Sequence, residues 1–199
     1  DVLLCVVFFL WVRDPPGSQL FPYTTLFRSG SIFFVGSVTG MVPHTRDPVF
    51  YSSISHESLR GALIDVDIHA THYEGPSSLA TFFIRKAEAH DIPMMTLVAG
   101  IPPYVQGTND HCIEASMEKL RKLAHLDIDM DELSARRIEF GQRLDRIIGK
   151  RPQLRDQIQK LEAIYDDQLG ITGDEPPESE TDSSDLRDWF DKQGFQFDL

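Results

Sequence analysis

Two short apolar segments, each followed by a loop rich in Pro and Gly, constrain the fold of this chain more than any other feature. Residues 31–35 read SIFFV and residues 94–99 read MMTLVA, and both predict buried strands. Apolar residues at helical spacing over 77–90 lie between an alternating segment over 65–70 and the MMTLVA segment. This order of strand, helix and strand favours parallel pairing and an α/β sheet. A further strand is expected over 49–53.

Helical patterns continue along the chain. A short helix is expected over 56–63, and Asn109 is a suitable N-cap for a helix over 110–125. The segments 129–149 and 152–168 predict an antiparallel helical hairpin, since Pro suits the first turn of the second helix. The narrow apolar stripe of this hairpin either packs on its own domain or serves an oligomer contact.

Acidic charge is concentrated at the end of the chain. The net charge is −12, and residues 170–199 hold nine Asp and Glu against two basic residues, which gives −7. A nucleic-acid partner is therefore not expected, because such surfaces are basic. The composition of 170–184 is that of a linker, and 185–193 predicts a short amphipathic helix. The aromatic residues that follow the linker either form a docking peptide or pack back on their own domain.

We interpret the first 29 residues as a segment whose origin differs from that of the rest of the chain. Residues 21–29 read FPYTTLFRS, which is the translation of a common sequencing adapter, so we interpret 1–29 as an artefactual or misjoined segment. The apolar run Val2–Val12 is too short to span a membrane, and a native run of this kind would suit a buried parallel strand. No Met precedes Met41, so we expect the chain to be a fragment.

Three loops contain the residues that could carry chemistry. The candidate binding residues are His44, Thr45 and Arg46 in the first loop, Tyr73, Glu74 and Gly75 in the second, and Tyr104 in the third. Loops that follow strands lie where α/β sheets bind ligands. His44 could act as an acid or base and Arg46 could hold an anion. The alternative is that these side chains only hydrogen-bond the loops together.

Metal and cofactor sites are not expected. His69 and His72 have a spacing that metals use, but no Cys or acidic pattern stands beside them. Cys5 and Cys112 are the two cysteines, and they provide neither a disulfide framework nor a thiolate site. The sequence contains no nucleophile-elbow, phosphate-loop or dinucleotide-binding motif, so we assign no catalytic residue.

The loops resemble the prokaryotic branch of the proteasome assembly chaperone (PAC2-type) family. The resemblance rests on GSVTGMVPHTR at 36–46, HYEGPSSLATFF at 72–83, TLVAGIPPYVQG at 96–107 and the helical stretch at 127–167. It implies a three-layer α/β/α domain with an appended helical segment, usually self-assembled. The front half of the family domain has no counterpart in this sequence. Asp198 stands where the docking tail of the family has Tyr.

We therefore expect a partial α/β domain over 30–126, a helical hairpin over 127–169, and an acidic linker with a short terminal helix over 170–199. The resemblance implies a cytoplasmic, non-enzymatic assembly chaperone or scaffold that needs no cofactor. Its expected partners are further copies of the chain and proteasome-like subunits. Binding to a membrane is not expected. The alternative is a ligase- or phosphorylase-like enzyme that uses the loop edge formed by His44, Arg46, Glu74 and Tyr104.

Overall fold

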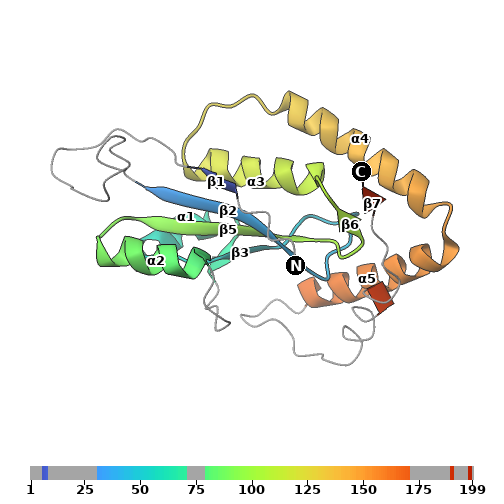
Figure 1. The fold of residues 1–199 in the computed structure, drawn as a ribbon, viewed down its shortest axis with the longest axis horizontal. Helices are drawn as coiled ribbons and strands as arrows, with labels where there is room; N and C mark the ends of the chain where they lie inside the picture. Colours follow the sequence, from blue (N-terminus) through green and yellow to red (C-terminus); the bar gives the residue numbers. More distant parts are fainter. Residues whose placement is uncertain (1–5, 9–30, 71–78, 171–188, 191–196, 199) are drawn as a thin grey trace. The chain divides into compact units, whose positions relative to one another are not determined.

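The computed structural model describes residues 6–8, 31–70, 79–170, 189–190 and 197–198 (Figure 1). The chain divides into two compact units. Unit 1 contains residues 1–37, 50–99 and 119–127, and unit 2 contains residues 38–49, 100–118 and 128–199. The adapter-like segment 21–29 and the candidate residues Tyr73, Glu74 and Gly75 lie outside the described residues.

The main sheet is mixed and has the order β1-β2-β5-β3-β4. Its strands are β1 (Val6–Phe8), β2 (Ile32–Thr39), β3 (Phe50–Ser52), β4 (His69–Ala70) and β5 (Met94–Ile101). The central strands β2 and β5 run in the same direction: the Ile32 N–H bonds the Pro93 carbonyl, and the Gly40 N–H bonds the Ile101 carbonyl, each at 2.8 Å. The strands predicted over 31–35, 49–53 and 94–99 are thereby confirmed.

The predicted pairing between the strand over 65–70 and the strand over 94–99 is wrong. β3 lies between β4 and β5, pairing in parallel with β4 and antiparallel with β5. The connection from β3 to β4 contains η1 (Glu57–Leu59) and α1 (Arg60–Ile64), which supplies the crossover that parallel neighbours require. β1 also differs from the parallel strand considered for its segment, because it pairs antiparallel with β2.

Helices cover both faces of the sheet in unit 1. On one face, α2 (Leu79–Ala89) packs through Ala87 against Phe34 and Met94. Met94 and Ala99 are five residues apart on β5, so their side chains point to opposite faces. Ala99 pairs with Phe50, whose ring lies 5.3 Å from the ammonium of Lys119 on α3 (Asp110–Leu123). The predicted three-layer α/β/α arrangement is confirmed.

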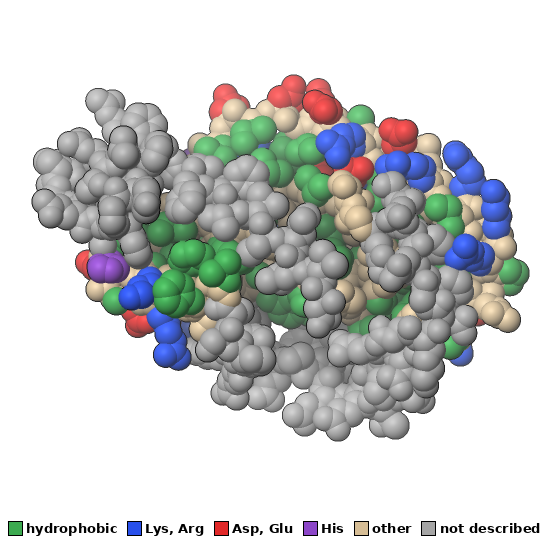
Figure 2. All heavy atoms as spheres, viewed as in Figure 1, with side chains coloured by type: hydrophobic (Ala, Val, Ile, Leu, Met, Phe, Trp, Pro, Cys, Tyr) green, Lys and Arg blue, Asp and Glu red, His purple; other side chains and the backbone are tan. Residues whose placement is uncertain are grey.

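The predicted helical hairpin forms part of unit 2. It consists of α4 (Asp131–Ile148) and α5 (Pro152–Gly170), and Figure 1 shows α5 turning back after a three-residue connection. Their apolar faces share one buried cluster, whose members are Tyr104, Val105, Phe140, Leu144, Ile148, Leu154, Ile158, Leu161 and Phe190. In Figure 2, acidic side chains gather over the start of α4 and basic ones over its end, as the helix dipole favours.

The end of the chain packs on unit 2 itself. β7 (Phe197–Asp198) pairs in parallel with β6 (Val105–Gln106). The side chain of Phe190 is 5% exposed, and its ring lies 5.4 Å from that of Tyr104. Of the two alternatives for the aromatic tail, the structure therefore has the one in which it packs back. None of the described helices is long and apolar enough to cross a membrane.

Candidate functional site

The loop over 40–49 is fastened to helix α5 by side chains of both. Arg46 donates from Nε to Asp166 Oδ1 at 2.8 Å and from Nη2 to Asp166 Oδ2 at 2.6 Å. Thr45 donates a hydrogen bond to Glu162 one turn earlier on the helix. The Tyr165 hydroxyl donates to the backbone carbonyl of Asp47 at 2.7 Å. Three consecutive residues of the loop are therefore held by one face of α5.

The ion pair with Asp166 fixes the role of Arg46 in this structure. Hydrogen bonding to Asp166 is the main reason why the pKa of Arg46 is raised, and the same bond lowers the pKa of Asp166. Bidentate pairing of guanidinium with carboxylate uses the geometry that would otherwise bind an anionic ligand. The position of Arg46 therefore fits the structural alternative given for the loops, in which such side chains only form hydrogen bonds within the protein.

His44 is positioned by the buried side chain of Tyr104. The Tyr104 hydroxyl accepts the backbone N–H of His44 at 2.9 Å and lies 2.8 Å from His44 Nδ1. Since that buried hydroxyl still has its own hydrogen to donate, we assign Nδ1 as the acceptor and place the ring hydrogen on Nε2. Tyr104 itself belongs to the buried cluster of unit 2. Burial raises the pKa of Tyr104 above its usual range, so the phenol stays protonated.

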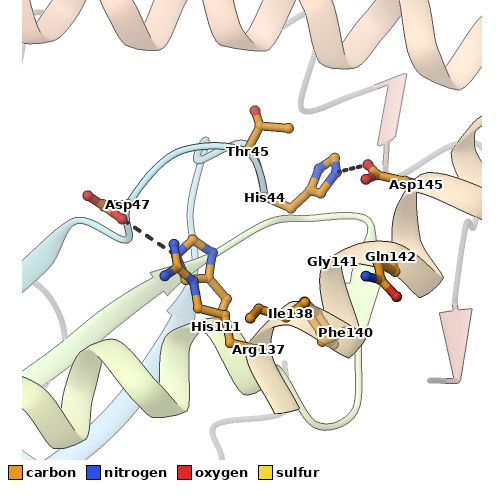
Figure 3. A pocket seen from close by; sticks show the side chains of 10 residues that line it. All are labelled: His44, Thr45, Asp47, His111, Arg137, Ile138, Phe140, Gly141, Gln142 and Asp145. Carbon is orange, nitrogen blue, oxygen red and sulfur yellow. Dashed lines mark ion pairs between the residues drawn. The ribbon is translucent and has the colours of Figure 1, made fainter. Parts of the chain in front are cut away.

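A pocket of about 450 Å³ lies between this loop, α3 and α4, all within unit 2 (Figure 3). Its lining combines two histidines, two aspartates, one arginine and a short apolar wall. The lining residues are His44, Thr45, Asp47, His111, Arg137, Ile138, Phe140, Gly141, Gln142 and Asp145. The volume falls within the range of pockets that bind small ligands.

Each pocket histidine lies beside an aspartate. His44 Nε2 is 3.5 Å from Asp145 Oδ1, and His111 Nε2 is 3.6 Å from Asp47 Oδ1. Figure 3 shows these two pairs on opposite sides of the pocket. Burial is the main cause that lowers the pKa of both imidazoles, and the neighbouring carboxylates only partly offset it. Both rings are therefore neutral near pH 7.

Helices α3 and α4 carry most of the residues that line the pocket. His111 lies in the first turn of α3, where the Asn109 side chain accepts the N–H of Cys112 at 3.1 Å and confirms the predicted N-cap. Arg137, Gly141 and Asp145 recur every four residues along α4, so they share one face. The sequence signal for this face was the pair of opposite charges two turns apart, at Arg137 and Asp145, but the pattern alone does not name its neighbour.

The sequence identified part of this pocket. His44 and Thr45 line it, Tyr104 supports it from the core, and Arg46 is directed to α5 instead. Sequence reasoning missed five polar lining residues: Asp47, His111, Arg137, Gln142 and Asp145. Among the described residues, no group of three or more His, Cys, Asp or Glu is placed to hold a metal ion.

Comparison with protein families gives one match. The model of the PAC2 family matches residues 19–148. The chain belongs to the PAC2 family. This match includes the strands β2 to β5 and the loop over 40–49, which confirms the resemblance stated for the sequence. A comparison with curated proteins finds no match to the chain.

Solved structures share the fold of this PAC2 family chain. A PAC2 family protein from Streptomyces avermitilis is 23% identical, with a TM-score of 0.56, over 62% of this chain and 52% of its own. The Mycobacterium tuberculosis protein Rv2714, of unknown function, is 17% identical, with a TM-score of 0.66, over 74% of this chain and 50% of its own. The proteasome-assembly chaperone homologue Rv2125 from the same organism is 18% identical, with a TM-score of 0.57, over 67% and 56%. The chain spans about half the length of these structures.

Proposed function

We propose that this PAC2 family chain is a non-enzymatic scaffold of the assembly-chaperone type, which binds proteins through the loop over 40–49 and the adjacent face of α4. Its partners are proteasome-like subunits and further copies of the chain, in the cytoplasm. Family membership supports the proposal, as does the fold shared with a structure described as a proteasome-assembly chaperone homologue.

The observation that carries the proposal is the fastening of the loop to α5. Arg46, Thr45 and the backbone of Asp47 are all bonded to that helix. A loop held in one conformation loses little conformational entropy when a partner binds, so more of the contact energy appears as affinity. Fixed loops of this kind suit a surface that recognises another protein.

An exposed apolar residue lies beside the loop. Ile138 on α4 is 62% exposed and lines the same pocket as His44 and Thr45. An apolar side chain next to a rigid polar loop provides the mixture of contacts typical of transient protein interfaces. We therefore place the centre of the proposed contact surface at Ile138.

The test is the formation of a complex with proteasome α-type subunits. The purified chain is mixed with these subunits and the products are weighed by native mass spectrometry. We expect a discrete complex that Ile138→Glu abolishes, because the carboxylate would be desolvated in the contact. The control is Ile64→Glu on α1, since Ile64 is 64% exposed and lies in unit 1. Absence of any complex, or equal loss with both variants, contradicts the proposal.

A further inference from the structure

Two carboxylates of the pocket have no cationic partner among the residues that the structure describes. Asp47 is 93% exposed and Asp145 is 74% exposed, and each lies beside a histidine held neutral by burial. Arg137, the cation of the lining, is already opposite Glu114, with its Nε 3.4 Å from Oε2. Glu114 thus takes up part of the charge of Arg137, and with two aspartates against one arginine the lining carries net negative charge.

The pocket wall also contains a buried donor without an acceptor. The side chain of His44 is 6% exposed, and its Nε2 has no hydrogen-bond partner. Asp145 Oδ1, at 3.5 Å, is too far for a good hydrogen bond. Since Nε2 carries the ring hydrogen, a ligand that offers an oxygen here would satisfy a donor that otherwise costs free energy.

An apolar strip lies between the two aspartates. Ile138 and Phe140 lie between the Asp47 and Asp145 sides of the pocket in Figure 3. Ile138 keeps most of its surface in solvent, whereas Phe140 is buried in the unit. Long basic side chains bury their methylene groups along such surfaces while the charged end stays near carboxylates.

We propose that this pocket binds the basic side chain of a lysine or arginine that belongs to an extended segment of a partner protein. The cationic end pairs with Asp145 or Asp47, the aliphatic stem lies along Ile138, and a backbone carbonyl of the segment accepts the His44 Nε2–H. This inference rests on the proposed protein-binding function and adds the chemistry of the partner. The net charge of −12 would in addition attract basic partners over longer distances.

The same contacts disfavour other ligand classes. A phosphate or carboxylate in the pocket would lie beside the carboxylates of Asp47 and Asp145, and these like charges would repel it. A metal ion needs three or four converging ligands, and the described residues supply no such group. A purely apolar ligand would leave the His44 donor buried and unpaired.

The experiment uses small probes and the intact chain, so it does not depend on a protein partner. Histidine side-chain signals are followed by NMR during titration with N-acetyl-lysine-methylamide, which carries both an ammonium and amide carbonyls. N-acetyl-norleucine-methylamide has the same stem without the charge, and N-acetyl-glutamate-methylamide reverses the charge. We expect the lysine probe to shift the signals of His44 and His111, and the other two probes to leave them unchanged.

Two matched variants locate the binding. Asp145→Asn removes one pocket charge without changing the size of the side chain, and Asp156→Asn makes the same change at an exposed position of α5 outside the pocket. We expect the first variant to weaken binding of the lysine probe by roughly two- to fivefold, the range of a partly exposed ion pair. The second variant should bind as the parent chain does. Equal weakening in both, or equal binding of the norleucine probe, overturns the inference.

A free diamine distinguishes the two possible sources of the cation. Cadaverine has the ammonium and the stem but no carbonyl for His44, so we expect it to bind more weakly than the lysine probe. If it binds as tightly, the assignment to a peptide segment is overturned in favour of a small amine. If the proteasome subunits bind but the lysine probe does not, this inference fails while the proposed function stands. If only the lysine probe binds, the proposed function fails alone.

Discussion

Burial in the folded chain favours the neutral form of His44 and His111. Each ring lies in the wall of the pocket, and removal from water disfavours its charged form. The aspartates beside them act in the opposite direction, but both carboxylates are largely exposed and screened by solvent. Burial therefore decides the sign, and the pKa of both rings lies below its ordinary value of 6.5.

The lowered pKa values of the two histidines predict that the stability of the chain depends on pH. Between the lowered pKa and 6.5, the unfolded chain binds protons that the folded histidines do not, so the free energy of unfolding falls as the pH is lowered through that window. We expect urea denaturation to show a loss of stability from pH 7.5 to 5.5 that is smaller in His44→Asn. The Asn side chain retains an acceptor for the Tyr104 hydroxyl. Identical pH dependence in the parent chain and the variant would contradict this account.

Helices α1, α2 and α3 end in the same way without glycine. After α1, α2 and α3, the residues Asp67, Asp91 and His125 adopt positive φ values of 55°, 56° and 51°. In each case the next residue donates its N–H to a carbonyl five residues back, which is the Schellman arrangement. Left-handed backbone at a non-glycine residue costs about 1–2 kcal/mol.

The end of α3 provides a direct measurement of that cost. We expect His125→Gly to be more stable than His125→Ala by about 1 kcal/mol, because the two variants differ at this position by the Cβ that clashes in left-handed backbone. His125 is exposed, so little packing is lost in either variant. Thermal and urea denaturation of both proteins measure the difference. An alanine variant as stable as the glycine variant would show that the turn adopts another conformation.

Helices of this chain were easier to predict than the order of its strands. The apolar spacing over 129–168 predicted α4 and α5, because helical periodicity is a property of neighbouring residues. Strand order depends on which distant segments pair. The segment over 65–70 was expected beside β5, but only His69 and Ala70 form a strand, and β3 takes the place next to β5. Nothing in the local pattern of β3 indicates its two neighbours.

Contacts across the whole chain determined which candidate residues form the site. Arg46 meets Asp166 after 120 residues of sequence, and His44 meets Tyr104 after 60. The sequence identified the loop and the helices separately, and the loop was correctly expected to follow a strand. It could not show that one face of α5 would bond Arg46 while α4 supplies Asp145 to the pocket.

The last prediction concerns the aromatic tail as part of the folded molecule. Phe190 packs against Tyr104, whose hydroxyl positions His44, so the tail supports the wall of the pocket from the core of unit 2. We expect Phe190→Ala to lower the free energy of unfolding by about 3 kcal/mol or more, the usual cost of emptying a buried phenylalanine site. Urea denaturation measures the loss, and the NMR signal of His44 should shift as Tyr104 loses its neighbour.

Ile138→Ala is the control for this measurement, since that side chain also belongs to unit 2 but is 62% exposed. Its truncation should change the free energy of unfolding by no more than about 0.5 kcal/mol, as is usual for surface positions. A tail that served as a detached docking peptide would make the two substitutions equally mild. A large loss for Phe190→Ala alone means that a partner could use the tail only after extracting Phe190 from the core, at a cost of similar size.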